Sequence, residues 1–170
     1  MITLSTAKSM VVLAASLGGS IQDCNEAQNP QRQIAGCSAY IDSGLADGEN
    51  LVTAYVNRAI ARTTTQNYKA AFADFAAALK VDPTNCLTLY NRGSVYLDLG
   101  KDDLAIQDFA SAIQADPNTG VAYYNRGLAY ERSGDVQKAV DDYRRAVDLD
   151  ATDVNAKAGL ERLTAQQQNF

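Results

Sequence analysis

The chain has 170 residues, of which 46% are apolar and 21% are charged, so it can bury a hydrophobic core. Its net charge of -5 disfavours nucleic acid as a partner, because nucleic acid binds basic patches. The sequence contains no His, which removes the commonest general base and the commonest metal ligand.

Residues 1–20 differ in composition from the rest of the chain. Lys8 precedes an apolar run from Met10 to Leu17, and small residues follow at 18–20. This order is typical of a signal peptide, which predicts export to a periplasmic or secreted location, and the run is too short for a membrane span. The alternative is an amphipathic N-terminal helix in a cytoplasmic protein, because Leu4, Ala7, Met10, Val11 and Ala14 share one helical face.

Residues 21–51 are expected to form an N-terminal cap. Residues 21–29 are polar and indicate a loop, and a helical pattern then runs from Pro30 to Gly44. In the repeat register described below, this helix is the second helix of an incomplete repeat whose first helix is missing. Residues 45–51 indicate a loop that leads into the first full repeat.

Two of the three cysteines lie in this cap. The same register places Cys24 and Cys37 on facing sides of a helical hairpin, so a disulfide between them is geometrically reasonable. It requires an oxidising compartment, in agreement with export. The alternative is two free thiols in a cytosolic protein. Cys86 is the odd cysteine, and no His exists to activate it.

An Asn-Arg dipeptide recurs with a spacing of 34 residues and reveals an internal repeat. Three full copies span residues 52–85, 86–119 and 120–153, without insertion. Each copy contains two helical stretches, so we expect an all-α fold of antiparallel helix pairs. The first helices are predicted at 52–64, 86–98 and 120–132, and the second helices at 68–80, 102–114 and 136–148. A polar helix at 154–166 is expected to cap the last copy.

The turns inside the three copies differ in one residue. Gly100 and Gly134 can adopt the left-handed conformation that ends a helix, whereas Gln66 adopts it less easily. We therefore expect a looser turn in the first copy.

Each repeated Arg is followed sixteen residues later by an Asp. In an antiparallel hairpin these two positions lie near one another, and a partly buried Arg needs a partner. We therefore expect three structural ion pairs across the helices: Arg58–Asp74, Arg92–Asp108 and Arg126–Asp142.

These repeats resemble the tetratricopeptide repeat. The pattern of an aromatic residue, a small residue, Tyr, Ala, Phe or Tyr and Ala is carried in the third copy by Tyr123, Gly127, Tyr130, Ala139, Tyr143 and Ala146. The first copy departs from it, with Arg62 in place of Tyr. The expected export signal, together with the two early cysteines, also resembles small exported bacterial repeat proteins. The family implies a right-handed superhelix whose concave groove, lined by the first helices, binds peptides without catalysis.

The groove side of the first helices supplies the candidate binding residues. They are Val56, Asn57 and Ile60 in the first copy, Tyr90, Asn91, Ser94 and Asp98 in the second, and Tyr124, Asn125, Leu128 and Arg132 in the third. An Asn column both donates and accepts hydrogen bonds, which suits a peptide backbone. The alternative is that each Asn bonds a neighbouring helix or water.

One use of this groove in the family is a clamp for a partner's terminal carboxylate. Of its five positions only Asn91 and Arg132 match, and apolar residues replace two of the cations. We therefore expect a protein or peptide partner with apolar or aromatic residues. The alternative function is a self-assembling, homo-oligomeric envelope scaffold. No nucleophile–base pair, phosphate loop or metal-ligand cluster is visible, so we expect no catalytic residue, cofactor or metal.

Overall fold

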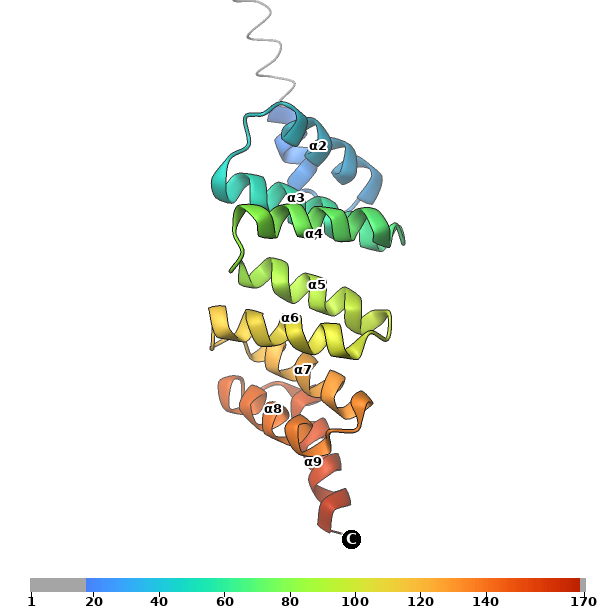
Figure 1. Ribbon diagram of the computed structural model, residues 1–170, viewed down its shortest axis with the longest axis vertical. Coiled ribbons are helices and arrows are strands. Elements are labelled where there is room, and N and C mark those ends of the chain that lie inside the picture. Colours follow the sequence, from blue (N-terminus) through green and yellow to red (C-terminus); the bar gives the residue numbers. More distant parts are fainter. Residues whose placement is uncertain (1–17, 169–170) are drawn as a thin grey trace, which may run out of the picture. The chain divides into compact units, whose positions relative to one another are not determined.

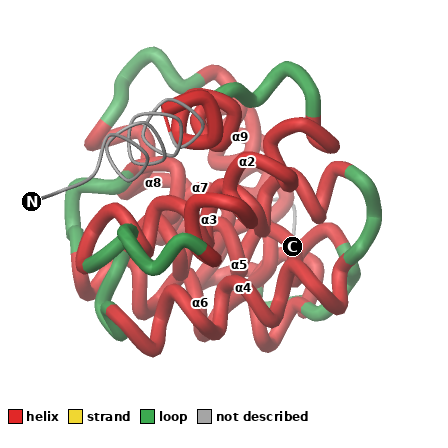
Figure 2. The backbone as a smooth tube through the Cα atoms, turned by 90° about the horizontal axis from the view of Figure 1, so that it is seen from above, coloured by secondary structure: helices red, strands yellow, loops and turns green. Residues whose placement is uncertain are grey.

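The computed structural model describes residues 18–168, and these consist of helices joined by loops and turns (Figures 1 and 2). The predicted all-α class is confirmed. The helices form two compact units, Met1–Pro83 and Thr84–Phe170. The predicted signal peptide lies outside the described residues, apart from positions 18–20.

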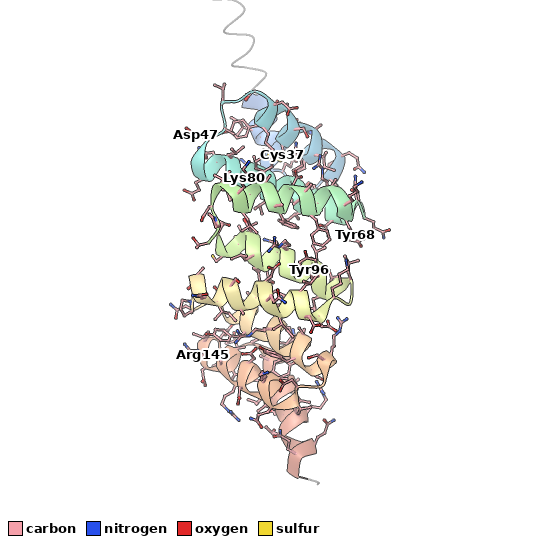
Figure 3. The ribbon with its side chains drawn as sticks, viewed as in Figure 1. Cys37, Asp47, Tyr68, Lys80, Tyr96 and Arg145 are labelled. Atoms are coloured by element: carbon pink, nitrogen blue, oxygen red, sulfur yellow. A yellow bond between two sulfur atoms is a disulfide. The ribbon has the colours of Figure 1, made fainter. Side chains whose placement is uncertain are left out.

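The first unit contains a helical segment at residues 18–25, followed by α2 (Pro30–Asp42), α3 (Gly48–Thr64) and α4 (Tyr68–Val81). Helix α3 packs against both α2 and α4. Val52 and Ala78 belong to one buried cluster, and Ala54 joins Cys24 and Cys37 in another. Cys37 is labelled on α2 in Figure 3.

Two predictions for the N-terminal cap are wrong. Residues 21–25 belong to a helix and only 26–29 connect it to α2, so the first helix of this hairpin is present. Helix α3 begins at Gly48, inside the predicted loop of residues 45–51. Gly48 has φ +45°, a conformation that glycine adopts without a steric penalty.

The two helical segments of the N-terminal hairpin, residues 18–25 and α2, pack very closely against one another. A Cβ atom added to Gly36 on α2 would lie 2.6 Å from the Asp23 Cβ and 2.8 Å from the Ser20 carbonyl oxygen. Cys24 and Cys37 form a disulfide, with their Cα atoms 4.4 Å apart. Gly36 therefore lets residues 18–25 approach α2 closely, and the disulfide bonds the two segments covalently.

The second unit contains five helices within its described residues. They are α5 (Cys86–Asp98), α6 (Asp102–Ala115), α7 (Gly120–Ser133), α8 (Val136–Leu149) and α9 (Val154–Gln168). Successive helices pack in pairs, and α6 also contacts α7. Phe109 and Tyr143 are fully buried. A Cβ added to Gly93 would lie 3.0 Å from Phe109, and one added to Gly127 would lie 2.8 Å from Tyr143, so the two glycines allow these rings to pack closely against their helices.

The turns inside the three helix pairs share one geometry, which corrects the expected looser first turn. Gln66 has φ +59°, close to the φ of +70° at Gly100 and +87° at Gly134. In each turn the next amide reaches back five residues along the chain, with Asn67 N donating to the Arg62 carbonyl at 2.8 Å. The first turn thus closes as tightly as the others, with a non-glycine residue in the left-handed region.

Candidate partner-binding surface

Each repeated Arg binds both carboxylate oxygens of the Asp sixteen residues later. Nε and Nη2 of Arg92 lie 2.7 Å from the two oxygens of Asp108. The corresponding distances are 3.0 and 2.8 Å for Arg58 with Asp74 and 2.8 and 2.8 Å for Arg126 with Asp142. The three aspartates are 3–6% exposed. These contacts join the two helices of each hairpin.

The hydrogen bond that Arg92 donates to Asp108 raises the pKa of Arg92, and the bond that Arg126 donates to Asp142 does the same for Arg126. In both cases the carboxylate stabilises the charged guanidinium more than burial destabilises it. The Arg126 guanidinium also lies 5.5 Å from the centre of the Tyr123 ring. The guanidinium groups of these arginines therefore bind the buried aspartates and hold the two helices of each hairpin together.

Arg62, which departs from the family pattern, joins the first of these pairs. Its Nη1 lies 2.6 Å from Asp74 Oδ2 and 3.3 Å from the Ala70 carbonyl oxygen. Asp74 thus forms ion pairs with two arginines, Arg58 and Arg62. An ion pair from α3 to α4 takes the place of the aromatic contact that the family pattern has at this position.

The three asparagines of the repeated dipeptide have different partners. Asn57 Nδ2 donates to the Cys24 carbonyl and to Asn25 Oδ1, both at 3.2 Å. Asn91 Nδ2 donates to the Leu87 carbonyl in its own helix at 2.8 Å. Asn125 Nδ2 donates to the Tyr90 hydroxyl at 3.2 Å. All three amide donors bind within the protein; Asn57 and Asn125 bind a neighbouring helix, as the alternative expected, whereas Asn91 binds its own helix.

In the first unit, one of the three candidate residues is buried and a second is hydrogen-bonded within the protein. Val56 is 2% exposed and belongs to the cluster with Val52 and Ala78, which corrects its predicted place in the groove. Asn57 is held by the N-terminal hairpin. Ile60 is 38% exposed and remains accessible.

In the second unit, α5 and α7 lie side by side and bring their candidate residues together. The Tyr90 and Tyr124 rings are half-buried, with centroids 6.0 Å from Phe109 and 5.7 Å from Tyr143. Leu128 packs against the cores around both of these rings. Ser94 Oγ donates to the Tyr90 carbonyl, and Asp98 is exposed.

Arg132 is anchored by the preceding helix pair. Its Nη1 donates to the Leu97 carbonyl at 2.8 Å, and its Nε lies 3.2 Å from Asp102 Oδ1. The second contact is an ion pair without hydrogen-bond geometry, and among the described residues that buried oxygen has no hydrogen-bond donor. The anchored guanidinium is still 45% exposed. It therefore presents a fixed positive charge at one end of α7.

Two further residues on the groove side of the first helices complete this surface. Leu87 and Val121 occupy the same repeat position in the first turns of α5 and α7, and they are 56% and 47% exposed. The 34-residue register contains this signal, because both positions are large and apolar on the groove side. We call the set the α5–α7 surface: Leu87, Tyr90, Asn91, Ser94, Asp98, Val121, Tyr124, Asn125, Leu128 and Arg132.

The C-terminal helix packs against the core around Tyr143 through Leu163, and one carboxylate also joins it to α7. Arg162 of α9 binds Glu131 of α7 with distances of 2.7 and 2.8 Å, and the Tyr143 hydroxyl donates to the same carboxylate at 2.8 Å. The Arg162 hydrogen bond lowers the pKa of Glu131, and burial raises the pKa of Tyr143. Glu131 is therefore held as an anion between two helices.

Residues 18–168 bring together no group of three or more Cys, Asp or Glu side chains that could hold a metal ion. No helix in the described part of the chain is long and apolar enough to cross a membrane.

A family model described as tetratricopeptide repeat matches residues 56–119 and 90–154, which together cover more than half of the chain. A search of curated proteins finds no match. The structure is similar to MamA 41-end from Desulfovibrio magneticus RS-1, with a TM-score of 0.77 and 24% identity over 91% of this chain and 85% of that one.

Two peptide complexes also share the fold. The first TPR domain of Spaghetti (RPAP3) bound to the HSP90 peptide SRMEEVD aligns with a TM-score of 0.68 and 22% identity, over 74% of this chain and 99% of that one. The second TPR domain of human RPAP3 in complex with the HSP70 peptide SGPTIEEVD aligns with a TM-score of 0.63 and 23% identity, over 67% and 95%.

Proposed function

Because the chain belongs to the tetratricopeptide repeat family, we propose that it is a non-enzymatic interaction module whose α5–α7 surface binds a segment of a partner protein. The observation that carries this proposal is the pair of exposed apolar side chains, Leu87 and Val121, at one repeat position of two adjacent helices. Exposed apolar residues that are grouped in this way favour partner binding.

The chemistry of the surface favours a partner segment with apolar or aromatic residues. Tyr90 and Tyr124 offer flat, amphipathic contact area beside Leu87 and Val121. The two peptides bound to the RPAP3 domains end in the acidic sequence EEVD. In this chain Leu128 occupies a position where the family's carboxylate clamp has Lys, so Arg132 is the remaining match to the clamp's cations. A strongly acidic segment would therefore find little compensating charge.

Peptide selection against the full chain tests this proposal. We expect selected peptides to be rich in apolar and aromatic residues, and the double variant Leu87→Asp/Val121→Asp to weaken their binding by at least about tenfold. Asp in the first turn of a helix does not destabilise the helix, so the fold should persist. Leu104→Asp on α6 is the matched control, because Leu104 is 40% exposed. Equal binding by wild type and double variant would refute the proposal.

A second copy of the chain is the competing occupant of the same surface, as in the self-assembling scaffold. Light scattering of the purified protein separates the two occupants. A monomer that binds the selected peptides supports the partner segment. A stable oligomer that Leu87→Asp/Val121→Asp dissociates assigns the surface to self-association.

We also propose that the protein works in an oxidising, exported location, because Cys24 and Cys37 are bonded and are 2% and 0% exposed. Mass spectrometry of natively produced protein tests this. We expect one disulfide and a processed N-terminus at or before Gly18, which leaves the helix at residues 18–25 complete. An intact Met1 with three free thiols would place the protein in the cytoplasm instead.

A further inference from the structure

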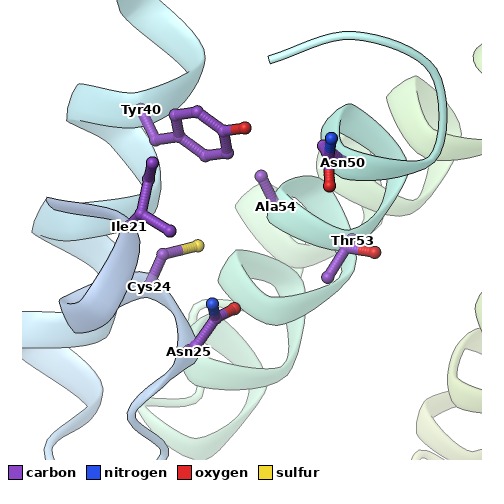
Figure 4. Close-up of a pocket in the computed structure, with 7 residues that line it drawn as sticks. All are labelled: Ile21, Cys24, Asn25, Tyr40, Asn50, Thr53 and Ala54. Carbon is purple, nitrogen blue, oxygen red and sulfur yellow. The ribbon is translucent and has the colours of Figure 1, made fainter. Parts of the chain in front are cut away.

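A small cavity opens between the N-terminal hairpin and α3 in the first unit. Figure 4 shows the seven residues that line it: Ile21, Cys24, Asn25, Tyr40, Asn50, Thr53 and Ala54. Cys24 and Ala54 are buried and form its base, Ile21 and Tyr40 are half-buried walls, and the other three residues are exposed at the rim. The site thus has an apolar floor and a polar entrance.

The cavity contains no charged lining residue. Its base and walls consist of a disulfide sulfur, a methyl group, an isoleucine side chain and the Tyr40 ring, which favour an aliphatic group. The Asn25 and Asn50 amides and the Thr53 hydroxyl can donate and accept hydrogen bonds, as a peptide backbone requires. The Asn25 amide is positioned by Asn57, whose Nδ2 donates to Asn25 Oδ1 at 3.2 Å.

The volume of the cavity, about 80 Å³, limits what it can hold. This volume suits a small aliphatic group such as the isobutyl group of leucine better than a bulky tryptophan indole. Sites for whole small-molecule ligands are roughly 300–1,000 Å³. The cavity is therefore sized for a single side chain.

We propose that this cavity is an anchor site for a leucine-sized aliphatic side chain of a partner polypeptide, whose main chain is hydrogen-bonded by Asn25 and Asn50. Thr53 stands at the groove-side position that Leu87 and Val121 occupy in the second unit, so the entrance lies on the side of α3 expected to face a partner. The inference concerns the first unit alone and does not depend on what the α5–α7 surface binds.

NMR titration of the full, oxidised, ¹⁵N-labelled chain tests the site with three probes. These are the N-methylamides of N-acetyl-leucine, N-acetyl-glycine and N-acetyl-tryptophan. We expect the side-chain amide signals of Asn25 and Asn50 to shift with the leucine probe at millimolar concentration. The glycine probe should bind at least about tenfold more weakly because it lacks the buried group, and the tryptophan probe should bind more weakly because its ring is larger than the cavity.

Two variants make the test specific. Thr53→Phe places a large ring at the entrance and should abolish the shifts, whereas Ala76→Phe, at an exposed position of α4, should leave them unchanged. Circular dichroism checks that both variants keep their helices. Equal binding of the leucine and glycine probes, or full binding by Thr53→Phe, would overturn the proposal. Nuclear Overhauser contacts from residues 1–17 to the Tyr40 ring would also overturn it, by assigning the cavity to the chain's own segment.

Discussion

Three aspartates are almost completely buried, and an arginine from the facing helix binds both carboxylate oxygens of each. An isolated buried carboxylate would lose several kcal/mol of hydration, and the paired guanidinium offsets this loss. In each hairpin the pair lies next to closely packed aromatic and small residues. Replacing only one partner of the pair should therefore destabilise the fold much more than replacing both partners by apolar residues of similar volume.

The second hairpin allows this asymmetry to be measured. Arg92→Leu leaves Asp108 buried and unpaired, and should lower the free energy of unfolding by about 2–3 kcal/mol, somewhat below the usual range because Arg92 is 25% exposed. The double variant Arg92→Leu/Asp108→Leu should recover most of that loss. Urea unfolding of the full chain measures both.

Arg144→Leu is the control for this series. Arg144 pairs with Asp141 at 3.3 Å on the surface, where both side chains are more than half exposed. Its loss should change stability by no more than about 0.5 kcal/mol. If Arg92→Leu and the double variant were equally unstable, the cost would come from lost packing rather than from the unpaired carboxylate.

The sequence indicates inward-facing residues better than outward-facing ones. The sixteen-residue offset between Arg and Asp is fixed by hairpin geometry, and each such pair is in contact in the structure. The asparagines share an offset too, but their partners depend on which group the neighbouring helix offers. A hydroxyl faces Asn125 because Tyr90 is one repeat earlier, whereas Asn57 faces the backbone of the N-terminal helix. Periodicity alone does not encode that difference.

At the level of elements, the three inter-helix turns have one hydrogen-bond pattern but different residues at the left-handed position. Gln66 pays a steric penalty there that Gly100 and Gly134 avoid. The surrounding helices fix the turn, so the backbone adopts the conformation in spite of the side chain. The structure thus contains one small, local source of strain.

Gln66→Gly should therefore stabilise the protein by about 0.5–1 kcal/mol, since relief of strain exceeds the added flexibility of the unfolded chain. The reciprocal variant Gly134→Gln should cost about 1 kcal/mol, and no atom lies within 4 Å of a Cβ added there, so backbone strain is isolated from clashes. Urea unfolding measures both changes. A destabilised Gln66→Gly variant would mean that the Gln side chain makes a compensating contact.

The attachment of α9 should depend on pH through Glu131. The Arg162 hydrogen bond holds the pKa of Glu131 below its ordinary value of 4.5, so the carboxylate favours the folded state when it is charged. This contribution is fully present above the unfolded pKa and is lost as the pH falls through the folded pKa. Glu131→Gln should be less stable than wild type at neutral pH, and the difference should shrink in acid. A difference independent of pH would contradict this account.

Helix boundaries show where sequence patterns are sufficient. Helix α5 spans the predicted residues 86–98, because an Asn cap precedes it and a Gly follows shortly after its end. The sequence does not predict the helix at residues 18–25, because Gln22, Asp23 and Asn25 are polar and leave too few apolar residues for a helical pattern. Its stability comes from tertiary contacts, the approach of Gly36 and the disulfide, which a local pattern does not contain.

On the scale of the whole molecule, the chain repeats one helical hairpin, but the interaction that joins the two helices differs between the first hairpin and the later ones. In the repeat register, Cys24 occupies the slot of Arg58, Arg92 and Arg126. The N-terminal hairpin is thus bonded covalently where the later hairpins use ion pairs. This difference affects the first unit alone, because the disulfide, its hydrogen-bonded neighbour Asn57 and the anchor cavity all lie before Pro83.

Removal of the disulfide should consequently weaken one unit and spare the other. The bond joins residues separated by 13 positions, a loop for which the chain-entropy model gives about 3 kcal/mol. Cys24→Ala/Cys37→Ala should speed hydrogen exchange in α2 and in the half of α3 around Asn57, which donates to the Cys24 carbonyl. Exchange in α7 and α8 should be unchanged, because a hairpin in a repeat protein is stabilised mainly by its neighbours.

Reductant added to the wild type should reproduce the pattern, and Cys86→Ala, which removes the free cysteine, should not. Hydrogen exchange followed by mass spectrometry resolves the helices separately. Faster exchange through both units would show that they unfold as one cooperative body. Unchanged exchange everywhere would show that noncovalent contacts, among them the close approach of Gly36, suffice to hold the N-terminal hairpin. A loss confined to the first unit would mean that the redox state of the compartment sets the stability of the anchor cavity while leaving the α5–α7 surface intact.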